Sequence, residues 1–143
     1  MIRQEFHVQR YWKVIVYYDM DYSLFSYVVR DVKKEFLSLK PNFKALTMGA
    51  YYDGVMEELE EVYVWMRSGM AKAVTYSNLE RHVSIVLFNE HEDRGDYLNS
   101  LVHEAEHVKQ AMLLAYDVED RGEEPAYTIG YLVERMWGEW RKV

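Results

Sequence analysis

The chain has 143 residues, half of them hydrophobic and none of them cysteine, and 24 acidic against 17 basic residues give it a formal net charge of −7. This length is typical of one domain with a single core, so we expect one domain over residues 1–143. Without cysteine there are no disulfides, iron–sulfur clusters or thiol nucleophiles, and any metal must be bound by His, Asp or Glu. The acidic balance, with Lys and Arg scattered along the chain, argues against a nucleic-acid partner.

The sequence predicts a cytoplasmic protein with no membrane partner. Its longest apolar runs, such as residues 85–88, are far shorter than the roughly 20 residues that a membrane-spanning helix needs. Residues 1–7 lack the apolar stretch and the small-residue cleavage site of a signal peptide. Nothing in the sequence indicates the oligomeric state.

The first half of the chain predicts one strand and two helices. Residues 11–18 are aromatic and β-branched, which indicates a strand that opens the sheet. Apolar residues then recur every three or four positions until Pro41, which is typical of an amphipathic helix. Residues 43–48 are ambiguous and favour an extended segment, and a second helix is expected between an N-cap at Asp53 and a stop at Gly69. Its apolar stripe is Val55, Leu59, Val62 and Met66.

The second half predicts a hairpin followed by two helices. Residues 72–76 and 82–88 are expected to form antiparallel strands joined by a short polar link. Asp96 is a candidate N-cap for a third helix, and a break at residues 117–122 precedes a fourth. The third helix has the apolar stripe Leu98, Leu101, Ala105, Val108, Met112 and Ala115, and the fourth has Ile129, Val133, Met136 and Trp140. We therefore expect an α+β fold with a small mixed or antiparallel sheet and about four helices.

The third predicted helix carries His103, Glu104 and His107 in an H-E-x-x-H pattern. Two histidines four residues apart lie on one face of a helix, so both imidazoles can bind a single Zn2+ ion. Zinc lowers the pKa of a bound water toward about 7 and polarises a carbonyl. Glu104, beside the histidines, is the candidate general base. Together these groups predict a zinc-dependent hydrolase.

A catalytic zinc has three protein ligands, and the candidates for the third begin the last predicted helix. That helix can pack antiparallel on the third and bring Glu123 or Glu124 toward the histidines. Glu123 is favoured as the ligand because Glu124 directly precedes Pro125. The glutamate that is not a ligand is then explained as an acid that stabilises the N-terminus of the helix through the helix macrodipole. Tyr127 and Tyr131, one turn apart on this helix, are the first candidates for stabilising an oxyanion.

From about residue 69 onward the chain resembles a known family. The segments that carry the resemblance are residues 75–78, 103–107 and 122–132. They are similar to segments of small zincin-like proteins of bacteriophages and of Bacteroidetes mobile elements, which are related to the gluzincin class of zinc metallopeptidases. The resemblance implies a zincin-like fold and a substrate cleft lined by the strand at 82–88. The roles it implies are zinc ligand for His103 and His107, third ligand for a downstream Glu, and general base for Glu104.

We therefore expect a zinc metallopeptidase that acts on a peptide or protein substrate. The alternative is a catalytically weak or inactive binding module of phage or mobile-element origin with the same fold. Its small size leaves little room for a deep cleft, and Tyr127 stands four residues after Glu123, where thermolysin-like members carry an acid. A chance occurrence of the motif in an interaction protein is the third hypothesis.

Overall fold

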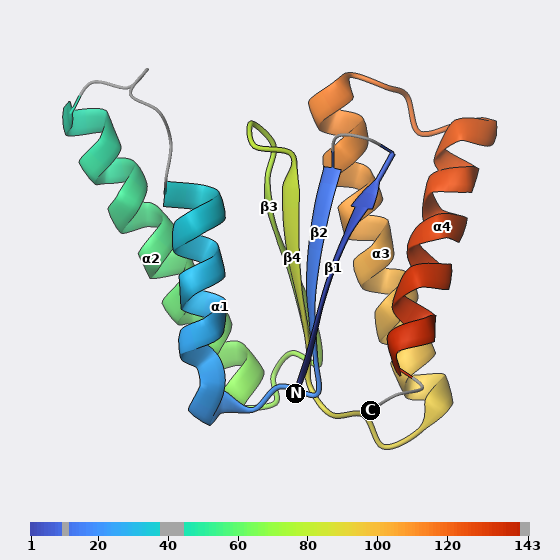
Figure 1. Cartoon of the computed structure of the whole chain (residues 1–143), viewed down its shortest axis with the longest axis horizontal. Helices are drawn as coiled ribbons and strands as arrows, with labels where there is room; N and C mark the ends of the chain where they lie inside the picture. Colours follow the sequence, from blue (N-terminus) through green and yellow to red (C-terminus); the bar gives the residue numbers. More distant parts are fainter. Residues whose placement is uncertain (10–11, 38–44, 141–143) are drawn as a thin grey trace. The chain divides into compact units, whose positions relative to one another are not determined.

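The computed structural model in Figure 1 describes the backbone of residues 1–9, 12–37 and 45–140, and the side chains of these residues except 45–53 and 140. The chain forms two compact units, the first made of residues 1–20 and 72–143 and the second of residues 21–71. A mixed four-stranded sheet and four α-helices confirm the predicted α+β class. None of the helices in the described residues is long and apolar enough to cross a membrane.

The first unit contains the sheet, whose strand order is β1-β2-β4-β3. Its strands are β1 (Ile2–Val8), β2 (Trp12–Tyr18), β3 (Ala73–Asn78) and β4 (Val83–Phe88). The two central strands, β2 and β4, run parallel with Ile15 opposite Ile85. β1 pairs antiparallel with β2, and β3 pairs antiparallel with β4, which confirms the predicted hairpin.

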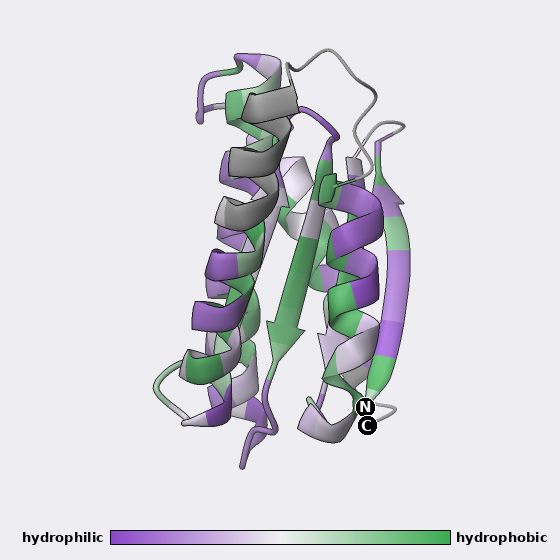
Figure 2. Ribbon diagram, turned by 90° about the vertical axis from the view of Figure 1, so that its left-hand side faces the viewer, coloured by the Kyte–Doolittle hydropathy of each residue, from purple (hydrophilic) through white to green (hydrophobic). Residues whose placement is uncertain are grey.

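β1 lies outside the predicted strands, and it, rather than β2, opens the sheet. Its side chains alternate, with Phe6 and Val8 buried and Glu5 exposed. Figure 2 shows both hydrophobic and hydrophilic residues along this strand, which starts at N. Gln4 also points inward, where its Oε1 accepts a 2.7 Å hydrogen bond from the Tyr18 hydroxyl. Because Gln4 is polar although it lies on the buried face, the sequence of this strand does not show the regular apolar–polar alternation that predicts a strand.

Two antiparallel helices, α3 (Arg94–Tyr116) and α4 (Glu123–Trp140), pack side by side and share a core with the sheet (Figure 1). The N-cap of α3 is Asp93, one turn before the predicted Asp96, and its side chain accepts a 2.8 Å hydrogen bond from the Asp96 amide. Tyr97 is buried and the neighbouring Leu98 is exposed, so the prediction that Leu98 faces the core is wrong. The buried stripe continues through Leu101 as predicted.

The sheet order places α3 and α4 toward opposite edges of the sheet. α3 contacts β3 and α4 contacts β1, and these two strands are the two edges. The Tyr131 hydroxyl of α4 donates to the carbonyl oxygen of His7 in β1 at 3.3 Å. On the other side, the Thr75 hydroxyl of β3 donates to Glu104 of α3. This separation decides which side chains can meet at the candidate site.

The second unit is helical. It contains a short 3-10 turn (Tyr22–Leu24), α1 (Phe25–Val32) with a π-helical continuation (Lys33–Leu37), and α2 (Ala45–Arg67). The predicted stripe of α2 is buried as expected, at Val55, Leu59, Val62 and Met66. α2 begins before Asp53, which lies inside the helix, and residues 45–48 are helical rather than extended. Residues 43–44 and Pro41 lie outside the described residues, whereas Gly69, with φ at 79°, follows the helix as predicted.

Lys109 of α3 binds the segment that leads into α4, and its loss should destabilise the fold. Its buried Nζ lies 2.8 Å from Glu106 Oε1 and 3.0 Å from Asp120 Oδ1. We expect Lys109→Ala to lower the free energy of unfolding by about 1–3 kcal/mol, because two charge-assisted hydrogen bonds and the packing of the alkyl stem are lost. Urea denaturation measures this difference.

Lys72→Ala is the matched control for this prediction. Lys72 is exposed and pairs with Asp96 at 2.6 Å, a surface ion pair. Such pairs contribute less than about 1 kcal/mol. Equal losses of stability in the two variants would contradict the role given to Lys109.

Candidate functional site

The two histidines of the motif lie on the side of α3 that faces β3. His103 Nε2 and His107 Nε2 are 3.1 Å apart, and their rings are nearly perpendicular. Both side chains are exposed, whereas Glu104 between them is 4% exposed. A hydrogen bond at this distance needs one Nε2 to donate and the other to accept, and the tautomers of the two rings set which is which. The neutral imidazole is the form that binds a metal.

The spacing of the two imidazoles suits a transition metal. Two nitrogen ligands at about 2.05 Å from a tetrahedral zinc lie about 3.3 Å from each other. The observed distance between His103 Nε2 and His107 Nε2 is 3.1 Å, close to that value. The two side chains are therefore spaced as two of the three protein ligands of a catalytic zinc.

The structure does not bring the expected third ligand to the histidines. Within the residues that it describes, no group of three His, Cys, Asp or Glu side chains is arranged to hold a metal. Glu123 and Glu124 begin α4, and Glu124 lines a separate hollow of about 180 Å³ together with Met112 and Thr128. The expected meeting of either glutamate with the histidines is therefore not found.

The direction in which the chain leaves α3 explains this difference. Lys109 follows His107 by two residues, which places it about 200° further around the helix. It binds Asp120, in the connection to α4, at 3.0 Å. The connection and the start of α4 thus lie on the face of α3 opposite the histidines. The two helices pack antiparallel as predicted. However, α4 approaches α3 on the face opposite the histidines, which keeps Glu123 and Glu124 away from them.

The two candidate oxyanion-stabilising residues also lie away from the histidines. Tyr127 is 74% exposed, and Tyr131 is bound through its hydroxyl to the His7 carbonyl oxygen of β1. Both belong to α4, which contacts the β1 edge of the sheet rather than the β3 edge. The structure therefore does not place either tyrosine beside the histidines.

Thr75 of β3 is a site residue that the sequence reasoning missed. Its Oγ1 donates a 2.5 Å hydrogen bond to Glu104 Oε2, which orients the carboxylate. Among the described residues, every buried polar side-chain atom has a hydrogen-bond partner. Glu104 Oε1 has none there, so this atom is not buried and is accessible. The sequence signal for Thr75 was its place in segment 75–78 of the resemblance.

A groove of about 400 Å³ runs between β3 and α3, and we call it the α3–β3 groove. Its ionisable lining residues, within the described chain, are the two histidines and Glu104. β3, not the predicted strand at 82–88, forms its wall, because β4 lies between β2 and β3 inside the sheet. The lining residues are Ala73, Val74, Thr75, Ser77 and Leu79 from the β3 side, and His103, Glu104, His107, Gln110, Ala111 and Leu114 from α3.

Comparison with known proteins adds no family to this geometry. The chain matches no protein-family model, no curated protein and no solved structure. The function therefore has to be argued from the two histidines, Glu104 and the groove that they line.

Proposed function

We propose that this protein is a metal-dependent hydrolase, with zinc as the preferred metal, that cleaves peptide bonds in a substrate bound along the α3–β3 groove. The observation that carries the proposal is that two close imidazoles and one oriented carboxylate meet in the same groove. His103 and His107 would hold the metal through their Nε2 atoms. Zinc, when bound, supplies a Lewis acid that polarises a carbonyl and makes water more acidic.

Glu104 is the general base in this proposal. Thr75 binds Oε2, which leaves Oε1 to take a proton from the attacking water and to pass it to the leaving amine. Because Glu104 is 4% exposed, its carboxylate has few alternative orientations. A fixed base lowers the entropic cost of reaching the reactive geometry.

β3 is suited to an extended peptide because it is an edge strand of the sheet. A peptide that lies beside an edge strand can form main-chain hydrogen bonds with it. The groove also carries apolar side chains beyond the histidines, where Leu79 and Leu114 are both exposed. No Lys or Arg is among its described lining residues, which favours a peptide over a small anion as the substrate.

A zinc titration of the wild-type protein and of His103→Ala and His107→Ala tests the metal site. We expect zinc to raise the thermal stability of the wild type, because a ligand that binds the folded state stabilises it. Each substitution should weaken zinc binding by more than about 100-fold, since a direct ligand matters at least as much as the groups that orient it. Cleavage of a peptide mixture, followed by mass spectrometry, tests the reaction.

Glu123→Ala and Glu124→Ala are the matched controls for this titration. Both side chains lie away from the histidines, so neither substitution should change the zinc affinity. The proposal would be removed if the wild-type protein binds no zinc, or if His103→Ala and His107→Ala each bind zinc as well as the wild type does.

Thr75→Val should lower the rate of hydrolysis by about tenfold, because the valine cannot hold the Glu104 carboxylate and a lost hydrogen bond of this kind costs about 1.5 kcal/mol. Thr75→Ser keeps the hydroxyl and should restore most of the rate. The zinc affinity should be the same in all three proteins, since Thr75 acts through Glu104. Equal rates for the Val and Ser variants would rule out this positioning role.

The lack of a third ligand in the described residues favours a second function, that of a peptide-binding module without hydrolysis. In that case β3 would pair with an extended segment of a partner, and the histidines would contribute contacts to it. A peptide that binds the zinc-treated protein, shifts the amide resonances of β3 and is recovered intact would support this function over the hydrolase.

A further inference from the structure

The candidate catalytic groups lie near one end of the α3–β3 groove rather than at its middle. β3 and α3 run in the same direction, because the Lys72–Asp96 contact lies at the start of both and the Thr75 hydroxyl reaches Glu104 further along. From Glu104 the described α3 lining continues to Leu114, a rise of about 15 Å at 1.5 Å per residue. In the other direction it ends at the residue before Glu104.

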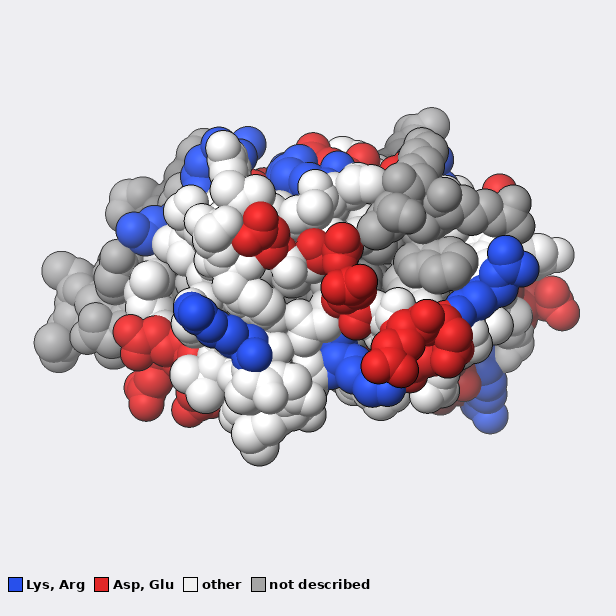
Figure 3. Space-filling model, turned by 90° about the horizontal axis from the view of Figure 1, so that it is seen from below, with Lys and Arg blue, Asp and Glu red and all other residues white. Residues whose placement is uncertain are grey.

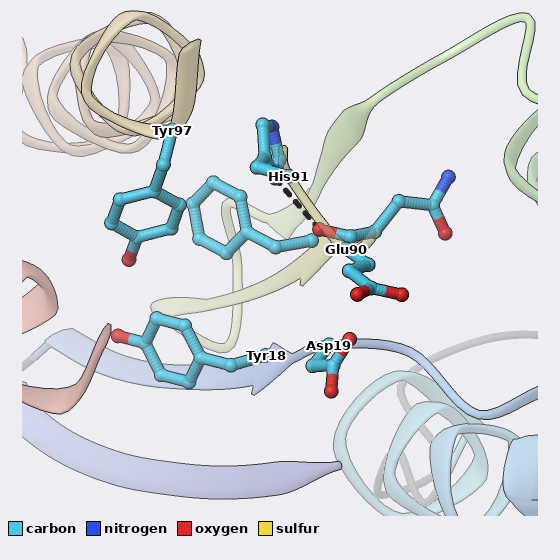
Figure 4. A pocket seen from close by; sticks show the side chains of 7 residues that line it. Tyr18, Asp19, Glu90, His91 and Tyr97 are labelled. Carbon is cyan, nitrogen blue, oxygen red and sulfur yellow. Dashed lines mark hydrogen bonds between the residues drawn. The ribbon is translucent and has the colours of Figure 1, made fainter. Parts of the chain in front are cut away.

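The end of the groove where α3 begins is bridged by an ion pair. There Lys72 Nζ lies 2.6 Å from Asp96 Oδ1. Figure 3 views the molecule from the side on which α3 begins, and both acidic and basic side chains are visible on it. The hollow of about 210 Å³ beside the start of α3 (Figure 4) shares no described lining residue with the groove, and the rings of Tyr18, Phe88 and Tyr97 around it are at most 1% exposed. The groove therefore does not continue past this end.

The opposite end of the groove is apolar and exposed. Leu79, which follows β3, is 42% exposed, and Leu114, in the last turn of α3, is 73% exposed. Ala111, one turn before Leu114, belongs to the same lining, and we call these three residues the apolar end. Beyond His107 the described lining contains no Asp, Glu, Lys or Arg. Large apolar side chains that stay exposed in a concave surface are typical of a site that a ligand covers.

The backbone of β3 is arranged to hold a peptide along this groove. The Asn89 amide donates to the Lys72 carbonyl oxygen at 2.9 Å, which continues the β3–β4 register by one pair. In an antiparallel pair every second residue bonds to the neighbouring strand, and the residues between turn their amide and carbonyl groups outward. Here those residues are Ala73, Thr75 and Ser77, which also line the groove. A peptide bound to them is extended, at about 3.3 Å per residue.

We propose that a substrate of this groove carries a large apolar side chain about three or four residues to one side of the cleaved bond. Leu79 and Leu114 bind this side chain. The rise of α3 from His107 to Leu114 is about 10 Å, which an extended peptide covers in about three residues. On the strand side, Leu79 follows Thr75 by four residues. This inference rests on the proposed function, because it places the cleaved bond at Glu104.

Cleavage of a mixture of decapeptides of random sequence, read by mass spectrometry, tests the preference. We expect Leu, Phe and Met to be enriched at a position about three or four residues from the cleaved bond, on one side only. Leu114→Asp should lower kcat/KM for the enriched peptides by about tenfold or more, because an apolar contact is replaced by a charge. Its zinc affinity should equal that of the wild type, since Leu114 lies two turns beyond His107.

Leu98→Asp is the matched control. Leu98 is 42% exposed on the same helix and does not line the groove. The same chemical change there should leave both the rate and the preference unchanged. If the wild type cleaves peptides without apolar enrichment, or if Leu98→Asp lowers cleavage as much as Leu114→Asp does, this inference fails while the hydrolase proposal stands.

Peptide binding to Glu104→Gln tests the apolar end without hydrolysis. The probes are a Ser–Ala decapeptide with one central Leu and the same peptide with Asp in its place, added at about 1 mM and followed by NMR. We expect the Leu peptide to shift the amide resonances of Leu79 and Leu114 and to bind about tenfold more tightly than the Asp peptide. Equal binding of the two peptides overturns the inference. Preferred binding of the Leu peptide without any cleavage by the wild type supports the apolar end and contradicts the hydrolase.

Discussion

Glu104→Gln should lower peptide hydrolysis by about 10²–10⁴-fold, the usual contribution of a positioned general base, while zinc affinity stays unchanged. Glutamine has nearly the same size as glutamate, and its amide oxygen can still accept the hydrogen bond from Thr75. It cannot take a proton from water. The loss should appear in kcat, because the substitution removes a group that acts in the transition state rather than in substrate binding.

Glu106→Gln provides the control for this substitution on the same helix. Glu106 lies two residues further along α3, where its Oε1 binds Lys109 Nζ at 2.8 Å, and it does not line the α3–β3 groove. The same chemical change there should leave hydrolysis unaffected and lower stability only slightly. If Glu104→Gln hydrolyses peptides as fast as the wild type, Glu104 is not the base and the hydrolase proposal fails with it.

The parts of the site that depend on one helix could be predicted from the sequence. His103 and His107 lie on one face of α3 because residues four apart always do so in a helix, and the structure brings their Nε2 atoms to 3.1 Å. The buried stripe through Leu101 follows from the same period. Such features need no knowledge of how the elements pack.

The parts that depend on packing between elements could not be predicted. The role of Thr75 requires that β3, not the strand at 82–88, lies at the sheet edge beside α3. The position of Glu123 depends on the side from which α4 approaches α3, and that side follows the Lys109–Asp120 contact. An ionic contact between two elements leaves no regular spacing of residues in the sequence from which it could be predicted. β1 was missed for a related reason, because Gln4 is a polar residue on the buried face, where its tertiary partners are the Tyr18 hydroxyl and the Arg135 carbonyl oxygen.

Leu101→Ala should cost the fold about 2–5 kcal/mol, the range for a large aliphatic side chain truncated in a core. Leu101 is fully buried on α3, in the core that this helix shares with the sheet and α4. The loss combines the transfer free energy of the removed carbons with the cost of the cavity they leave. Urea denaturation measures it, and Leu101→Val, a smaller truncation, keeps the prediction testable if the alanine variant does not fold.

Leu98→Ala is the control, because Leu98 lies three residues earlier on the same helix and is 42% exposed. Its truncation should cost less than about 1 kcal/mol. Equal losses in the two variants would mean that the core is not where the buried stripe of α3 places it.

The zinc titration of the Leu101 variants then separates the stability of the fold from the metal site. The histidines are held by their spacing on one helix, so zinc should raise the stability of Leu101→Val by the same increment as in the wild type. A smaller increment would mean that the position of α3 against the sheet, and not the helix alone, sets the metal affinity. In that case Thr75 and the β3 edge would be part of the metal site as well as of the groove.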